Sequence, residues 1–347
     1  MRYFSEQLVA NSRPHAEWWD DVSINREHFH QVEDHMAALR NASAVLPRDA
    51  WMELDGITRR VMRDDEGEVY MRDLMALARP INIGKLVSLT RVASDSENPV
   101  IRSMSGQVPV PMDKVTYSFR GNPVPIFQDG YGREWREWNT LQSENFDALA
   151  DDAEAANAKI RKDQADYVLN GDANIVFQGY PAAGIRTNPL AKAINIGASG
   201  ANINLAAIAT TSDAIDAFFT QTLGAMLDAN LIAGKVNLYV SPEIGRNLDR
   251  SYSGSAGFKG GTLLQYLLTN RRINKIEVTF KLSGNEFFGF VPSAEYIRPL
   301  IGMAVNTTAM PRLYPTANYQ FLVMGAMGLE IRADFSGKAG VFYSTST

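Results

Sequence analysis

Residues 138–171 read WNTLQSENFDALADDAEAANAKIRKDQADYVLNG and carry a continuous helical pattern. No proline and no internal glycine interrupts the stretch, and alanine, the strongest helix former, is frequent in it. At 1.5 Å per residue the predicted helix is about 45 Å long, well above the globular mean. Gly171 follows Asn170 and favours a left-handed stop at this point.

The apolar residues of this predicted helix recur at the helical period, so one narrow face is expected to be buried. Most charged residues of the stretch lie away from that face. We therefore interpret the helix as a spine against which a sheet packs, with an ordinary core helix as the alternative. The apolar stripe consists of Trp138, Leu141, Leu149, Ala153, Ala156, Ile160 and Tyr167.

Composition excludes several classes of protein. The chain of 347 residues has no cysteine, which removes disulfide bonds, thiolate catalysis and zinc sites with cysteine ligands. The net charge is −5 and Lys and Arg do not cluster, which argues against a protein that wraps nucleic acid. The sequence has no apolar run of about eighteen residues, so no membrane span is predicted, and its first residues lack a secretory signal core.

Residues 1–80 are predicted to form an arm of helices. Helical patterns cover residues 26–42 and 50–79, and Pro80 closes the second pattern. All four histidines of the chain lie in this part, so the remainder lacks the commonest general base. Their spacing does not bring three metal ligands to one helical site, and surface or interface histidines are the preferred interpretation. These histidines are His15, His28, His30 and His35.

From residue 81 to 134 the pattern changes to strands and turns, which predicts an extended β ribbon. In VTYSFRG (115–121), Tyr117 and Phe119 alternate with Ser118 and Arg120, as expected of a strand with two different faces. Several prolines confine the segment to edge or free-standing geometry. A two-stranded ribbon cannot form a core of its own, so we expect it to lie on another subunit.

Residues 172–310 are predicted to form a compact α/β block. The stretch Thr211-Ser212-Asp213 offers an N-cap for a helix that ends at Gly234, and VNLYVS (236–241) has the pattern of a buried strand stopped by a proline. The segments INKIEVTFKL (273–282) and NEFFGFVPS (285–293) are predicted to pair as a hairpin. The last segment, 314–346, is rich in strand patterns.

No stretch predicts an active site. GSAGFKGGT (254–262) is the nearest approach to a phosphate loop, but Lys259 does not adjoin Thr262 and a helix separates the loop from the preceding strand. A mobile loop is the preferred interpretation. Asp151, Asp152 and Glu154 point apart on a helix, which indicates a solvated face. We therefore predict no catalytic, cofactor-binding or metal-binding residue and no cofactor; an enzyme using carboxylates or lysine is the minor alternative.

Four stretches resemble the Hong Kong 97-type major capsid protein of tailed bacteriophages, over about residues 80–347. YGREWREWNTLQSENFDALADDAEAANAKIRKDQADYVLNGD (131–172) is similar to that family's passage from ribbon to spine helix, and the turn at Gly179, Gly184-Ile185 and Asn188-Pro189 follows it. VNLYVSPEIGRNL (236–248) is similar to its strand–proline–helix unit. FVPSAEYIRPLIGMAV (290–305) and MGLEIRADFSGKAGVFYS (327–344) are similar to its closing segments.

The resemblance implies an α+β chain with a Hong Kong 97-like capsid fold. The expected parts are a helical N-terminal arm (1–80), an extended β ribbon or E-loop (81–134), a peripheral domain with the spine helix (135–171 and 311–347) and a compact axial domain (172–310). It further implies a non-enzymatic major capsid protein, which self-assembles through hexamers and pentamers into an icosahedral shell around a double-stranded DNA genome.

Partners and location are expectations from the same resemblance. They are a separate scaffolding protein, a portal protein, a decoration protein and packaged DNA without sequence-specific contact, with no membrane contact. The protein is expected in the virion capsid, after assembly in the host cytoplasm. The alternative is an encapsulin-like nanocompartment shell protein that encloses a cargo enzyme, which the 80-residue arm disfavours.

Overall fold

The computed structural model describes residues 67–346, apart from 97, 99, 108, 110–111, 144–147 and 255–259. The chain divides into two units, Met1–Val61 and Met62–Thr347, and every described residue lies in the second. The predicted helix 26–42, most of the predicted helix 50–79 and the four histidines are therefore outside the described residues. No helix in the described ranges is long and apolar enough to cross a membrane.

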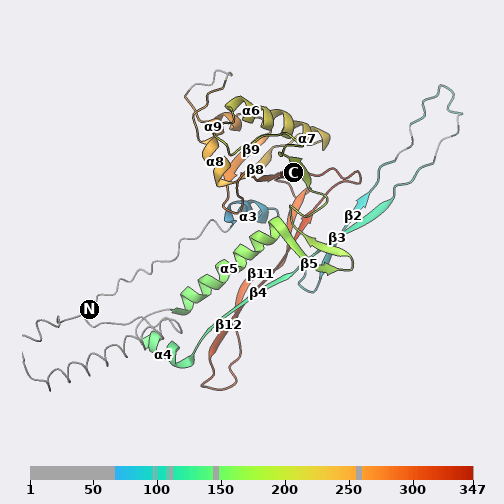
Figure 1. Cartoon of the computed structure of the whole chain (residues 1–347). Helices are drawn as coiled ribbons and strands as arrows, with labels where there is room; N and C mark the ends of the chain where they lie inside the picture. Colours follow the sequence, from blue (N-terminus) through green and yellow to red (C-terminus); the bar gives the residue numbers. More distant parts are fainter. Residues whose placement is uncertain are drawn as a thin grey trace, which may run out of the picture. The chain divides into compact units, whose positions relative to one another are not determined.

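A four-stranded sheet packs against the longest described helix, α5 (Ala148–Asn170), as the sequence predicts (Figure 1). Ala156 and Ile160 on the helix are buried against Val323 of the sheet. The apolar stripe recurs at the helical period and therefore lies on one face of the helix. Burial of this face against the sheet stabilises the contact. In order across the sheet, the strands are β1 (Arg79–Pro80), β11 (Ile297–Ala309), β12 (Tyr319–Ile331) and β4 (Ile126–Arg133).

The predicted single helix 138–171 differs from the structure at its first part. The structure has α4 (Trp135–Ser143) and α5, and residues 144–147 between them are outside the described ranges. With 23 residues, α5 accounts for about 35 Å of the predicted 45 Å. Its end is as predicted: Gly171 follows Asn170 with a φ of +67°, a conformation that glycine adopts without strain.

A five-stranded sheet covered by short helices forms the first hydrophobic core. Thr211 caps the first helix by accepting a hydrogen bond from the backbone N–H of Ala214, as predicted, and β8 is fully buried. In order across the sheet, the strands are β7 (Lys192–Asn195), β13 (Val341–Thr345), β10 (Phe287–Phe290), β8 (Val236–Val240) and β9 (Ile273–Val278). The helices are α6 (Ser212–Ala217), the π-helical η1 (Phe218–Thr222), α7 (Leu223–Ala229), α8 (Pro242–Leu248) and α9 (Leu263–Leu268).

Two predictions for this block are wrong. The strands β9 and β10 do not form a hairpin, because β8 lies between them, parallel to β9 and antiparallel to β10. Because every residue of β8 is buried, an interior position in the sheet, with a strand on each side, suits it better than an edge. The helix predicted to end at Gly234 ends at Ala229, because Leu231 adopts a φ of +55°, which a helix does not allow.

Where the two sheets meet, a second core joins them. Tyr70 of α3 (Glu68–Met75) is fully buried there, and its hydroxyl donates to the carbonyl of Ala165 on α5 (2.9 Å). Sheet membership crosses the division expected from the sequence. Although β4 was expected in the ribbon and β11 in the compact block, both pair with β12, whereas β13 pairs with β10. Two hairpins remain, β2 (Val87–Ala93) with β3 (Tyr117–Pro123) and β5 (Gly171–Phe177) with β6 (Tyr180–Ala183).

Candidate functional site: a two-faced β arm

We call residues 87–123 the arm. Its strands pair antiparallel from Val87 opposite Pro123 to Ala93 opposite Tyr117. Just beyond the last pair, the N–H of Ser94 donates to the carbonyl of Thr116 (2.8 Å), and the N–H of Thr116 donates to the Ser94 hydroxyl (2.9 Å). In the described ranges, local hydrogen bonds of this kind continue the arm beyond its strands, and none of its side chains belongs to a buried core cluster.

The inner face of the arm is polar and is fastened to the end of β12. Thr90 and Arg120 lie opposite each other, so their side chains share this face. The Thr90 hydroxyl donates to Oε1 of Glu330 (2.7 Å). The guanidinium of Arg120 donates to the carbonyls of Ala333 (3.0 Å) and Asp334 (3.2 Å). These contacts fix the base of the arm on the four-stranded sheet.

The anchor of this joint is a fully buried carboxylate. Glu330 is 0% exposed, and its Oε1 also lies 3.0 Å from Nη2 of Arg298 and 3.4 Å from Nε of Arg332. Its Oε2 is buried with no hydrogen-bond partner among the described residues. Loss of the Glu330 charge would be costly, because the guanidinium groups of Arg298 and Arg332 would then lack their negative partner.

The outer face of the arm is apolar and largely uncovered. Leu89, Tyr117 and Phe119 alternate with the inner residues and are 58%, 58% and 60% exposed. The guanidinium of Arg91 stacks 5.0 Å from the centre of the Tyr117 ring on the same face. The side chains of Val100, Met104 and Met112 further along the arm are also exposed. Contact of such an apolar face with water is unfavourable, so its burial against another surface would lower the free energy.

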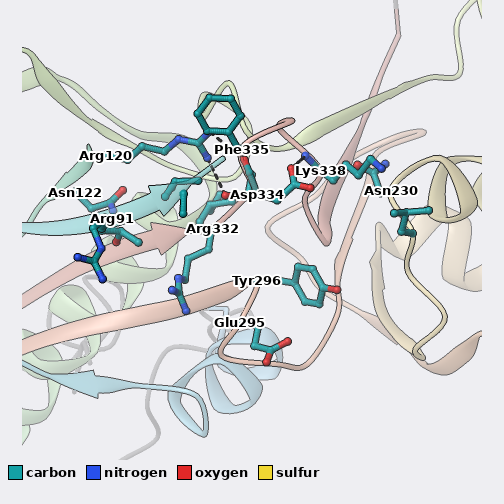
Figure 2. Close-up of a pocket in the computed structure, with 16 residues that line it drawn as sticks. Arg91, Arg120, Asn122, Asn230, Glu295, Tyr296, Arg332, Asp334, Phe335 and Lys338 are labelled. Atoms are coloured by element: carbon teal, nitrogen blue, oxygen red, sulfur yellow. Dashed lines mark hydrogen bonds between the residues drawn. The ribbon is translucent and has the colours of Figure 1, made fainter. Parts of the chain in front are cut away.

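A cavity of about 550 Å³ lies at the base of the arm (Figure 2). Arg120 and Asn122 line it from the arm, Arg332 and Asp334 from the chain after β12, and Asn230 from the turn after α7. Figure 2 shows the bond from Arg120 to the Asp334 backbone at its edge. The guanidinium groups of Arg120 and Arg332 already contact oxygen atoms of Ala333 and Glu330. We therefore interpret the cavity as part of the joint between arm and body.

The residues singled out from sequence are not brought together into a chemical site. Asp152 forms an ion pair with Arg133 (2.5 Å), and no group of three potential metal ligands occurs within the described ranges. Of the stretch 254–262, residues 255–259 are outside those ranges, as are the histidines. The alternation is confirmed for residues 117–120, since Tyr117 and Phe119 are exposed whereas Ser118 and Arg120 are half-buried.

The contact of Thr90 with Glu330 was missed at the sequence level. One signal for it exists, because Glu330 is the single charged residue in the largely apolar strand YQFLVMGAMGLEI. A charged residue in a buried strand requires a partner. The sequence does not say which partner, since Thr90 is 240 positions away.

Solved structures from phage and related particles are similar to this chain. A chain of the capsid of Myoviridae phage XM1 has a TM-score of 0.63 at 12% identity, over 88% of this chain and 99% of that one. A chain of Microbacterium phage Oxtober96 has a TM-score of 0.58 at 13% identity, over 90% and 98%. A chain of the capsid of an empty GTA particle has a TM-score of 0.53 at 12% identity, over 85% and 94%. The chain therefore has the α+β fold of phage capsid chains.

Sequence comparisons add a family. A search of curated proteins found no match. The model of one protein family, described as a family of unknown function (DUF6260), matches residues 41–344. Since this match spans well over half of the chain, the protein belongs to the DUF6260 family.

Proposed function

We propose that this protein is a major capsid protein, a structural subunit without catalytic activity that assembles with copies of itself into an icosahedral shell. The observation that carries the proposal is the arm, whose polar inner face is fastened to its own subunit while its apolar outer face is uncovered. A second copy is the natural cover, because closed symmetry repeats the same contact around the shell. The capsid fold of the chain supports this assignment.

The finer parts of the proposal follow the Hong Kong 97-like plan. On sequence alone they are an N-terminal arm (1–80), an E-loop (81–134), a peripheral domain (135–171 and 311–347) and an axial domain (172–310), and we revise these bounds by the strand pairing. The pairing of β4 and β11 with β12 favours placing both strands in the peripheral domain. The pairing of β13 with β10 favours placing it in the axial domain.

In this proposal the shell consists of hexamers and pentamers and encloses double-stranded DNA without sequence-specific contact. A scaffolding protein, a portal protein and a decoration protein are its proposed partners. The protein would be found in the virion, after assembly in the host cytoplasm.

The experiment compares the full chain with a variant whose arm is shortened. In that variant an Asn-Gly turn replaces residues 94–116, so that it joins the paired residues Ala93 and Tyr117 directly. Both proteins are expressed together with the proteins encoded beside this one and studied by negative-stain microscopy and light scattering. We expect closed shells from the full chain and soluble protein without shells from the variant.

Two results would contradict the proposal. The full chain could remain monomeric at every concentration, or the shortened variant could close normal shells. Nuclease treatment of purified particles separates the two kinds of container: protected double-stranded DNA supports a viral capsid, and a protein cargo in its place supports the nanocompartment.

A further inference from the structure

The base of the arm is held from both sides. Thr90 and Arg120 fasten the inner face, as described above. On the outer face, the ring of Tyr180 from β6 lies directly over Gly121 of β3. A methyl group on Gly121 would lie 2.5 Å from Cδ2 and 2.6 Å from Cγ of Tyr180, which is closer than carbon atoms approach in proteins. The ring can therefore occupy this position only because residue 121 is glycine.

The hairpin that carries Tyr180 is built to present its ring. Phe177 and Tyr180 are opposite each other and flank a two-residue turn. Both turn residues have positive φ, +51° at Gln178 and +82° at Gly179, as in the tight turns that match the twist of a hairpin. The hairpin starts at Gly171, directly after the long helix α5. The position of Tyr180 is thus tied to the long helix α5 through one short hairpin.

We propose that the packing of Tyr180 on Gly121 sets the direction of the arm, and that this direction sets how neighbouring copies are spaced in the shell. Tyr180 is a positioning residue in this proposal, which rests on the proposed function for its second half only. The arm is a long lever. Met104 follows Ala93 by eleven residues, which span up to about 35 Å when extended, so a tilt of about 10° at the base would move it by about 6 Å.

The arm direction can be measured in the isolated subunit. Because the chain has no cysteine, Met104→Cys and Ser336→Cys provide two exposed and unique sites for spin labels. Pulsed electron resonance then gives the distance distribution between arm and body. We expect Gly121→Ala to shift this distribution by about 6 Å, and Tyr180→Ala to broaden it.

Two control variants separate the packing of Tyr180 on Gly121 from unspecific effects of a substitution. Tyr180→Phe keeps the ring and should match the parent protein. Gly130→Ala adds the same methyl group to β4, where its nearest atom, the carbonyl oxygen of Phe321, is 3.6 Å away, and should also match. The double variant Gly121→Ala/Tyr180→Ala should show no larger shift than Tyr180→Ala, because the clash is gone. A Gly121→Ala distribution that superimposes on that of Gly130→Ala would overturn the proposal.

Shell assembly tests the second half. We expect Gly121→Ala to change shell diameter or to raise the concentration at which assembly begins by about tenfold or more, with Gly130→Ala unchanged. A moved arm with unchanged diameter and onset would overturn the link to spacing. Altered shells with an unmoved arm would overturn the positioning role. If the parent protein forms no shells, the proposed function fails, while the distance measurement still decides the contact.

Discussion

Two aromatic strands of this protein, β10 and β3, have opposite environments. The residues of β10, Phe287 to Phe290, are all buried, because β10 has neighbours on both edges, β8 and β13, and a core on both faces. Tyr117 and Phe119 of β3 are more than half exposed, because within the described ranges β3 pairs with β2 alone. Residue type alone therefore does not determine burial here; the number of neighbouring elements does.

The difference has an energetic consequence. Each buried aromatic side chain removes roughly 150–250 Å² from water, at about 25 cal/mol per Å² of apolar surface. Side chains of β10 contribute this free energy when the chain folds. Those of the outer arm face contribute it only when a second surface covers them. The body should thus account for folding stability and the arm for assembly, and the four predictions below test this division.

The largest effect is expected in the body. Phe288→Ala removes a ring that packs against Tyr70 and Tyr239 and should lower the free energy of unfolding by about 3–5 kcal/mol. Urea unfolding of the unassembled subunit measures this loss. Phe288→Leu, which keeps most of the volume, should cost clearly less. A loss below about 1 kcal/mol for the alanine variant would contradict the assigned core.

The joint between body and arm comes next. Glu330→Gln removes the charge that Arg298 and Arg332 share and should cost about 2–3 kcal/mol of unfolding free energy, because both cations lose their compensation in a buried site. Glu295→Gln is the matched control: this exposed carboxylate lines the cavity at the same joint and should change stability by less than about 0.5 kcal/mol. Equal effects of the two variants would remove Glu330 from its role as anchor.

A smaller effect appears at high pH. Burial, and then the hydrogen bond to Asp73, raises the pKa of Tyr239 above its ordinary 10.0. Because the pKa is raised in the folded state, the stabilisation by the protonated Tyr239 hydroxyl is complete below about pH 10. It is lost as the pH rises further. Tyr239→Phe should therefore reduce the alkaline fall in stability by about 1.4 kcal/mol per pH unit.

The measurement is the urea midpoint between pH 9 and 11. Burial raises the pKa of Tyr167 as well, so part of the alkaline fall should remain in Tyr239→Phe. Tyr343→Phe, on strand β13 of the same sheet, is the control for the removal of a tyrosine hydroxyl as such. An unchanged pH profile of Tyr239→Phe would contradict the environment assigned to this hydroxyl.

The smallest effect on folding is expected in the arm. Phe119→Ala makes the same type of change as Phe288→Ala but should alter the unfolding free energy by less than about 0.5 kcal/mol, because the ring is exposed in the subunit. Under the proposed function, it should nevertheless raise the concentration at which assembly begins, measured by light scattering. A large loss of subunit stability would show that the arm face is already covered within one chain.

Local patterns were sufficient for several elements. The alanine-rich stripe predicted the helix and the sheet on which it packs, since its period depends only on residues within the helix. The alternation around Tyr117 predicted a strand with two faces. The predicted cap marked the start of α6, and the proline predicted to stop the buried strand is the first residue of α8. Each of these signals is complete within a few turns or residues.

Pairing between distant segments could not be obtained from these signals. The residues of β10 predict a buried strand, but not that β8 separates it from β9. Glu330 indicates that a partner is needed, but the partners Thr90 and Arg298 come from two other strands. The ring of Tyr180 fits over Gly121, 59 positions earlier, because glycine has no side chain there. A single glycine gives no periodic pattern that would predict this contact. The amino-acid sequence by itself therefore determines the helical period, the strand alternation and the helix starts. The strand order, the burial of Glu330 and the contacts at the base of the arm were decided by the tertiary structure, because they depend on packing between segments far apart in the chain.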